Sequence, residues 1–322
     1  EIHELLRQFA QEQLAGSIDE GRQNGAQQQH SHYYLNMLAA QEKVLESPHQ
    51  RAALDAIHVD YENISIAWRW AVQQHKFGML APAVHALFLY CEARGDFRAG
   101  VVLLTAAAAG LDADTIADTD DKPRLQALRG HLCMRLGACE VHLSNFAFGE
   151  QLLQDGLQVS ELPCERAFAL VYLGLANADR GNLPLSRAQL QDSLALSRAN
   201  DDNAGIARAL LYLLQGESNY VQADRICSES LVHARKSERP DLIAHLLIYL
   251  GFFKCCLGDY ASAGACLQEG LELCEQLGLR SEKASALESK GFAAWCQGDI
   301  VAAERYIDQS LAIYNELGRR TL

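Results

Sequence analysis

The side chains best suited to chemistry in this sequence are its cysteines. There are ten, and half of them gather near the C-terminus, at Cys255, Cys256, Cys266, Cys274 and Cys296. Most occupy Ala- and Leu-rich stretches, where a thiol usually acts as a small buried apolar group. No C-x-x-C pair occurs, and adjacent cysteines suit a single zinc ion poorly. We interpret them as reduced, core-filling thiols of a cytoplasmic protein, with a thiol-rich ligand site as the less favoured alternative.

Other candidate groups carry weaker patterns. His30 and His32 could begin a metal site, but solvated loop histidines are the favoured interpretation. The acidic run at residues 118–121 lacks the spacing and final Glu of an EF-hand and is interpreted as an exposed loop. The sequence contains no phosphate-binding G-x-x-x-x-G-K-[ST] loop, no G-x-S-x-G and no H-E-x-x-H. We therefore predict no catalytic residue, no metal and no cofactor.

Charge and hydropathy exclude two classes of partner. The formal net charge is −13, and the longest basic run is Arg319–Arg320, so the bulk field repels a phosphate backbone. No stretch of about 18 apolar residues is present, and the longest one, residues 242–253, is broken by His245. We predict that the chain contacts neither nucleic acid nor membrane directly.

The elements that position these residues come from an internal repeat with four clear copies. Each copy has a glycine followed seven residues later by a turn: Gly137 and Ser144, Gly174 and Gly181, Gly251 and Gly258, Gly291 and Gly298. A small residue and then a larger apolar one follow each turn: Gly149 and Leu153, Ser186 and Leu190, Ala263 and Leu267, Ala303 and Ile307. These columns predict pairs of helices joined by tight turns.

Each column has a physical reason. The glycine lets the second helix pack closely against the first, and the small residue marks the closest crossing. The turn residues tolerate left-handed backbone, and the Asp or Asn that follows caps the next helix. The larger residue is expected to fill the space between neighbouring repeats. Each pair leaves an apolar face that only the next pair can bury, so the pairs are expected to form a solenoid.

These columns resemble the tetratricopeptide repeat from about residue 80 to residue 317. Two degenerate units, with turns at Gly95 and Ser218, raise the total to about six repeats. The first lacks a glycine in its first helix, and the first helix of the second is expected to be short. The resemblance implies an all-α fold, a right-handed superhelical solenoid over residues 76–322. Residues 112–123, rich in Asp and Thr, are predicted to form an irregular loop.

The first 75 residues are helical but lie outside the repeat pattern. Helices are predicted at 2–10, 32–44 and 61–71, with a flexible polar loop at 16–29. Trp68 and Trp70 face different sides of their helix, so at least one should pack against the solenoid. The motifs at 2–14, 30–35 and 62–71 resemble the region after the nucleotide-binding module in bacterial signal-transduction ATPases, such as maltose-activator and LuxR-like transcriptional regulators. This resemblance implies an upstream nucleotide-binding module and a sensor or oligomerisation arm.

In this repeat family, ligands usually lie against the first helices. The resemblance places ten residues in such a groove: Met134, Ala138, Val171, Leu175, Asp179, Ile248, Phe252, Glu288, Phe292 and Trp295. They are mainly apolar and lack the Lys and Asn of a carboxylate clamp, which favours a hydrophobic peptide, a helix or a small effector. Alternatively, some of them pack the solenoid. A free-standing scaffold joining two proteins is the second function considered, and an enzyme built across the groove the third.

Overall fold

The computed structural model of the chain describes residues 20–111, 121–214 and 216–316. These residues fold into helices without any β-strand, which confirms the predicted all-α solenoid. The N-terminal helices are α2 (Glu20–Ala40), α3 (Glu42–Leu45), α4 (Gln50–Gln73), α5 (Phe77–Leu80) and the 3-10 turn η1 (Ala81–Ala83). The helix predicted at 2–10 and most of the loop predicted at 112–123 lie outside the described residues. Pro123 belongs to helix α9.

The rest of the chain forms six helix pairs within the described ranges. They are α6 (Val84–Arg94) with α7 (Phe97–Gly110), α9 (Lys122–His142) with α10 (Phe146–Val159), α11 (Pro163–Asp179) with α12 (Leu183–Ala199), α13 (Asn203–Leu213) with α14 (Tyr220–Lys236), α15 (Pro240–Cys256) with α16 (Tyr260–Leu277), and α17 (Arg280–Cys296) with α18 (Ile300–Glu316). Helix α13 has 11 residues where α11 and α15 have 17, so the fourth pair has the short first helix predicted for it.

The tight turns within the pairs have the predicted left-handed backbone. Their φ angles are positive at Gly95 (67°), Ser144 (64°), Gly181 (80°), Gly258 (82°) and Gly298 (82°). Side-chain caps follow at Asp96, Asn219, Asp259 and Asp299. Capping was wrongly predicted at Asn145, because its amide donates instead to Glu140 at 2.6 Å, and Asn182 makes no side-chain cap.

The glycine column brings the two helices of a pair into direct contact. A Cβ added at Gly251 would lie 2.5 Å from Cγ of Leu267, and one added at Gly174 would lie 2.6 Å from Cγ of Leu190. Both leucines are buried. The larger apolar residue therefore covers the glycine of its own pair, whereas the sequence analysis assigned it to the space between neighbouring repeats. The helix crossing in three of the four clear pairs depends on this leucine-on-glycine contact, and Ile307 takes the leucine's place over Gly291 in the fourth.

The N-terminal region contains one clear departure from expectation. The polar segment predicted as a loop at 16–29 is helical from Glu20 onward, and His30 and His32 are helix residues rather than loop residues. Gln is a good helix former, so the Gln residues of this exposed stretch outweigh its glycines. In the same helix Leu35 is buried, and Gln27 accepts a hydrogen bond of 3.0 Å from the indole of Trp70.

The N-terminal helices join the solenoid through a shared core. Trp68 is fully buried, and its indole donates to the carbonyl oxygen of Leu103 in α7 at 2.8 Å, which confirms that one tryptophan packs against the repeats. The largest apolar cluster runs from Leu35 to Leu210 and so crosses residue 75. The division into regions 1–75 and 76–322 stays a prediction.

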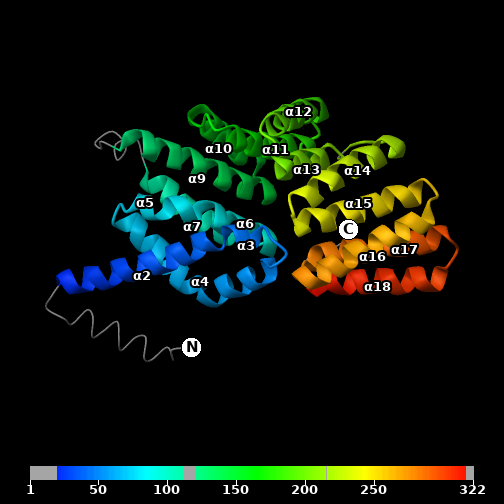
Figure 1. Cartoon of the computed structure of the whole chain (residues 1–322), viewed down its shortest axis with the longest axis horizontal. Coiled ribbons are helices and arrows are strands. Elements are labelled where there is room, and N and C mark those ends of the chain that lie inside the picture. The colour runs from blue at the N-terminus through cyan, green and yellow to red at the C-terminus, as the bar shows by residue number, and fades with distance from the viewer. Residues whose placement is uncertain (1–19, 112–120, 215, 317–322) are drawn as a thin grey trace.

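Successive first helices of the pairs contact one another, α9 with α11, α11 with α13, α13 with α15 and α15 with α17. They therefore form the inner layer of the superhelix, and the second helices lie outside them. Figure 1 shows that the chain curves round until the last pairs lie beside the N-terminal helices, and α16 contacts α4. Within the described ranges, no helix combines the length and apolar character needed to cross a membrane.

Candidate functional site

The inner face of the first helices begins with a buried polar cluster. Arg135 of α9 is 3% exposed, and its guanidinium donates to both carboxylate oxygens of Glu165 in α11 at 2.8 Å. Its Nε donates to Nδ1 of His85 in α6 at 3.0 Å, and the guanidinium carbon lies 3.8 Å from the ring centre of Phe168. Burial and the Arg135 charge keep the pKa of His85 well below its ordinary value, so the imidazole is a neutral acceptor.

A second part of this cluster connects α6 and α11 to one further first helix, α13. Glu92 of α6 accepts a hydrogen bond of 2.7 Å from the hydroxyl of Tyr172 in α11 and forms an ion pair of 3.7 Å with Arg208 of α13. Burial opposes ionisation of Glu92, but Arg208 and the Tyr172 hydroxyl hold its pKa below the ordinary value. Side chains from four first helices thus meet near the superhelix axis.

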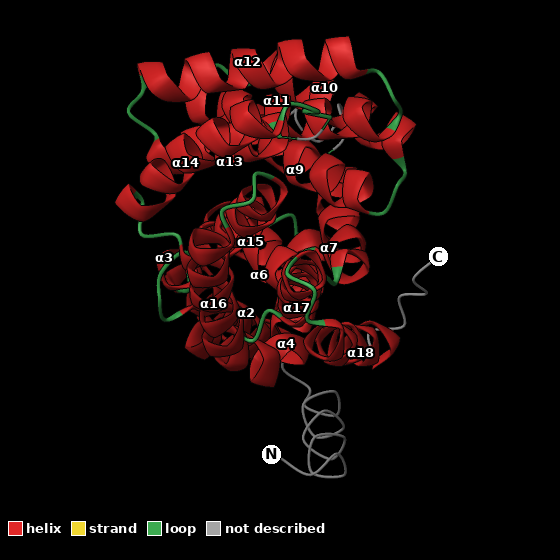
Figure 2. Ribbon diagram, turned by 90° about the vertical axis from the view of Figure 1, so that its right-hand side faces the viewer, coloured by secondary structure: helices red, strands yellow, loops and turns green. Residues whose placement is uncertain are grey.

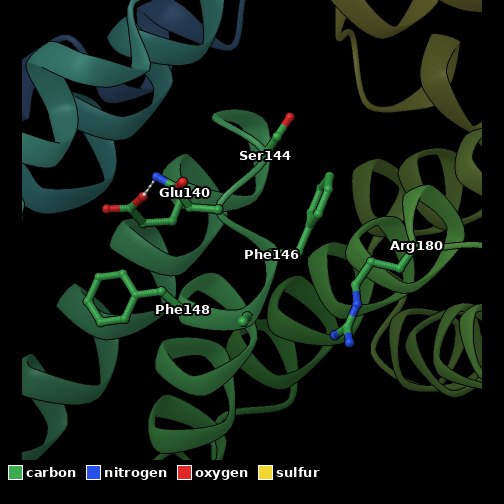
Figure 3. Close-up of a pocket in the computed structure, with 7 residues that line it drawn as sticks. Glu140, Ser144, Phe146, Phe148 and Arg180 are labelled. Atoms are coloured by element: carbon green, nitrogen blue, oxygen red, sulfur yellow. Dashed lines mark hydrogen bonds between the residues drawn. The ribbon is translucent and has the colours of Figure 1, made fainter.

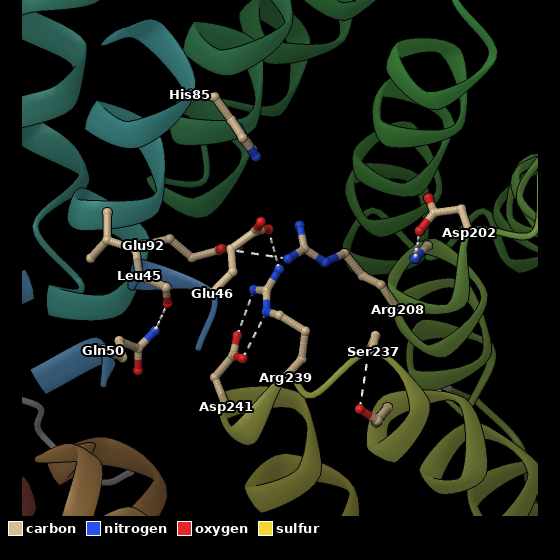
Figure 4. Close-up of polar contacts among 12 residues, drawn as sticks. Leu45, Glu46, Gln50, His85, Glu92, Asp202, Arg208, Ser237, Arg239 and Asp241 are labelled. Carbon is tan, nitrogen blue, oxygen red and sulfur yellow. Dashed lines mark hydrogen bonds and ion pairs between the residues drawn. The ribbon is translucent and has the colours of Figure 1, made fainter. Parts of the chain in front are cut away.

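The cluster ends where α15 begins. Arg239, just before α15, donates to both oxygens of Asp241 at 2.9 and 2.8 Å and to Glu46 at 2.6 Å (Figure 4). Burial opposes ionisation of Asp241, yet Arg239 lowers the pKa of that carboxyl. Because these charges already pair with one another, the cluster stabilises the superhelix rather than presenting reactive groups.

The cysteines and histidines of the described residues do not form a reactive centre. No group of three or more His, Cys, Asp or Glu side chains is arranged there to hold a metal ion. Burial raises the pKa of Cys91 to about 12 and, together with the neighbouring Cys296 and Cys256, raises that of Cys255 to about 11. Thiols with such pKa values are protonated near neutral pH and are poor nucleophiles.

A row of aromatic side chains lies at the C-terminal end of the inner face. The row, called here the aromatic row, consists of Tyr220, Tyr249, Phe252, Phe292 and Trp295. Ring centres lie 6.4 Å apart for Tyr220 and Phe252, 5.4 Å for Phe252 and Phe292, and 6.1 Å for Phe292 and Trp295. Tyr249 is 41% exposed and Trp295 is 61% exposed. The row therefore spans three successive pairs and faces solvent.

The predicted groove residues divide between the solenoid interior and its surface. Five are buried, namely Met134, Ala138, Val171, Leu175 and Ile248. Phe252 and Phe292 are half-buried, whereas Asp179, Glu288 and Trp295 are exposed. Met134, for example, lies against Gly156 of α10, within its own pair. Contact with a partner stays a prediction for the whole set, and the exposed and half-buried members are the ones that can make it directly.

Sequence reasoning missed the polar cluster for two reasons. Arg135 and Tyr172 each follow by one residue a position assigned to the groove, and one residue is a rotation of about 100° on a helix. The two degenerate repeats were also left out. Counting ten residues back from their turns, as for Met134, gives His85 and Arg208. Applying the same ten-residue count to the degenerate repeats would therefore have found these two members of the cluster.

A separate open depression of about 530 Å³ lies at the turn between α9 and α10 (Figure 3). It is lined by Glu140, Ser144, Asn145, Phe146, Ala147, Phe148 and Arg180. Its Asn145 amide and Arg180 guanidinium are already paired, since Asn145 donates to Glu140 and Arg180 donates to Glu150 at 2.9 Å. The depression therefore presents no unpaired charge among these residues.

Comparison with known proteins agrees with this geometry. Residues 242–316, which hold most of the aromatic row, match the tetratricopeptide repeat. The fold is a tetratricopeptide-repeat solenoid. Such solenoids are scaffolds for protein interaction. No curated protein sequence matches the chain.

Solved structures with similar folds share little sequence with this solenoid. A Rap protein complexed with Competence and Sporulation Factor has 13% identity and a TM-score of 0.57, covering 90% of this chain and 93% of that one. BtubC (BKLC) from P. vanneervenii has 13% identity and a TM-score of 0.55, covering 70% of this chain and 94% of that one. The apo form of RapI has 12% identity and a TM-score of 0.52, with 72% and 97% covered. These likenesses concern the fold.

Proposed function

We propose that this solenoid binds a protein segment along the aromatic row and does so as a non-catalytic sensor arm. The observation that carries the proposal is the exposure of Trp295, which is 61% in a row of contacting rings. The rest of the inner face is filled by the chain's own side chains, as Arg135 shows at 3% exposed. Exposed aromatic rings at the end of an otherwise filled inner face are typical of a binding surface.

The charges beside the row indicate the chemistry of the partner. Glu288 is exposed and precedes Phe292 by one helical turn, so a carboxylate flanks the apolar surface. The nearby Lys254 is paired with Asp224 at 3.1 Å, and the whole chain carries a net charge of −13. The segment that fits is an amphipathic one, with apolar side chains on the rings and a Lys or Arg beside Glu288. The similar Rap structure, solved with Competence and Sporulation Factor, supports a role in binding signals.

The larger protein context of this proposal rests on the N-terminal motifs. Their order resembles signal-transduction ATPases, so the solenoid would sense a partner or a small effector in a bacterial, cytoplasmic transcriptional regulator. An upstream nucleotide-binding module would receive the signal, and the solenoid would also be able to mediate oligomerisation. The alternative is a free-standing scaffold that joins two proteins. The full-length gene separates the two, because only the regulator requires an ATPase module.

Affinity capture with matched variants tests the binding surface. Wild-type chain, Trp295→Ala and Val59→Ala are each used to capture partners from extract, and native mass spectrometry shows any retained small molecule. Val59 is 82% exposed on α4, is not part of the row, and serves as the control. Removing an exposed aromatic contact should weaken binding roughly thirtyfold if it is a main anchor of the partner. A partner lost only with Trp295→Ala supports the proposal, whereas equal capture by all three proteins would remove the row from consideration.

A further inference from the structure

One ion pair joins the N-terminal helices to the fifth helix pair of the superhelix. Glu46, at the end of α3, and Arg239, at the start of α15, are 193 residues apart in sequence, yet Nη1 of Arg239 lies 2.6 Å from Oε1 of Glu46. Figure 4 shows Asp241 holding the other side of the same guanidinium. The Arg239 side chain is 5% exposed and that of Glu46 is 34% exposed. We call the contact among these three residues the ring clasp.

The clasp lies where the array closes on itself. Helix α16 contacts α4, and the two views show the last pairs next to the N-terminal helices (Figures 1 and 2). The largest buried apolar cluster reaches from Leu35 to Leu210, and the next runs from Ala207 to Phe253. Among the described residues, none of the buried apolar clusters contains members from both α3–α4 and α15–α16. The Arg239–Glu46 ion pair therefore closes the array without a shared buried apolar cluster, whereas neighbouring pairs along the array share buried apolar residues as well as polar contacts.

A polar closing contact separates more readily than an apolar one. Glu46 is partly exposed already, so water can replace Arg239 as its partner at a modest cost. Arg239 keeps both hydrogen bonds to Asp241 when Glu46 leaves, so no buried charge is left unpaired. The apolar contacts of the N-terminal helices with α6 and α7 remain intact during such a separation.

We propose that the ring clasp is a reversible closure. The Arg239–Glu46 ion pair breaks when the superhelix opens between α3–α4 and α15–α16, and it forms again when the superhelix closes. Closing connects the N-terminal helices directly to α15, the helix that carries Tyr249 and Phe252. Opening leaves the two ends connected only through the intervening pairs. The closure depends on these contacts alone, so it stands independently of the proposed binding function.

Two variants of the whole chain test the closure. Glu46→Gln removes the negative charge that pairs with Arg239 and changes the shape of the side chain little. Glu229→Gln is the matched control, because it removes an ion pair of the same 2.6 Å length, with Arg198, between neighbouring pairs. We expect Glu46→Gln to speed amide hydrogen exchange in α3, α4 and the start of α15 about tenfold, as loss of a half-buried ion pair would. It should also increase the radius of gyration in small-angle scattering.

The control should change neither quantity, and circular dichroism should show that both variants keep their helices. Raising the salt concentration on the wild-type chain is a second route to the same opening, since salt screens a half-exposed ion pair. It needs no substitution and therefore covers the case in which Glu46→Gln fails to fold. Exchange and scattering that stay at wild-type values in Glu46→Gln and in high salt would overturn the proposal.

Discussion

Replacing Gly251 by alanine tests the leucine-on-glycine contact that sets the helix crossing. The added Cβ would lie 2.5 Å from Cγ and 2.7 Å from Cδ2 of the buried Leu267. Alanine gains about 1 kcal/mol over glycine in a helix, whereas overpacking a core costs about 1–3 kcal/mol. The close atoms are the branch carbon and one methyl of a side chain that is fixed in the core, which places the cost at the upper end. We expect a net loss of stability of about 2 kcal/mol.

Gly264 of α16 supplies the matched control. It is exposed, and an added Cβ would meet nothing within 4 Å, so Gly264→Ala should gain the helix preference of about 1 kcal/mol. Urea denaturation followed by circular dichroism measures both variants. In a Leu267→Ala background the clash is absent, and Gly251→Ala should become neutral or stabilising. If Gly251→Ala instead stabilises the wild-type chain as much as Gly264→Ala does, the close-crossing argument is refuted.

Two further predictions concern buried side chains. Trp68→Phe removes the indole hydrogen bond to the Leu103 carbonyl and opens a small cavity, so thermal denaturation should show a loss of about 3 kcal/mol. Burial and Arg135 lower the pKa of His131 to about 4 from an ordinary value of 6.5. Because the unfolded chain takes up this proton first, stability should fall as the pH drops from 6.5 toward 4, and urea titrations of His131→Asn should show a shallower fall.

The sequence could predict the repeat positions at which only a small residue or a left-handed backbone fits. A glycine at a helix crossing and a left-handed residue at a tight turn are local requirements. Within a single repeat, Gly251 therefore predicts the close crossing and Gly258 predicts the turn. The length of α13 was predicted in the same way, from the spacing around Ser218. These features recur with the repeat, which is why four clear copies were enough to define the fold.

Contacts between distant residues were not predictable in this way. The bond between Glu46 and Arg239 has no local pattern, because it depends on how far each pair rotates relative to the one before. Arg208 stayed hidden for a different reason, since its repeat lacks the glycine that marks the four clear copies. The helix at the start of the described chain was missed because its glycines and polar composition were given more weight than the good helix propensity of Gln.

The ring clasp constrains the number of helix pairs that can lie between α3 and α15. An open solenoid can gain or lose a unit by duplication or deletion, since each repeat contacts only its neighbours. In this array, an extra pair between α7 and α15 would carry Arg239 past Glu46, and a missing pair would leave it short. The number of units before α15, normally free to change in evolution, is here tied to whether Arg239 can reach Glu46.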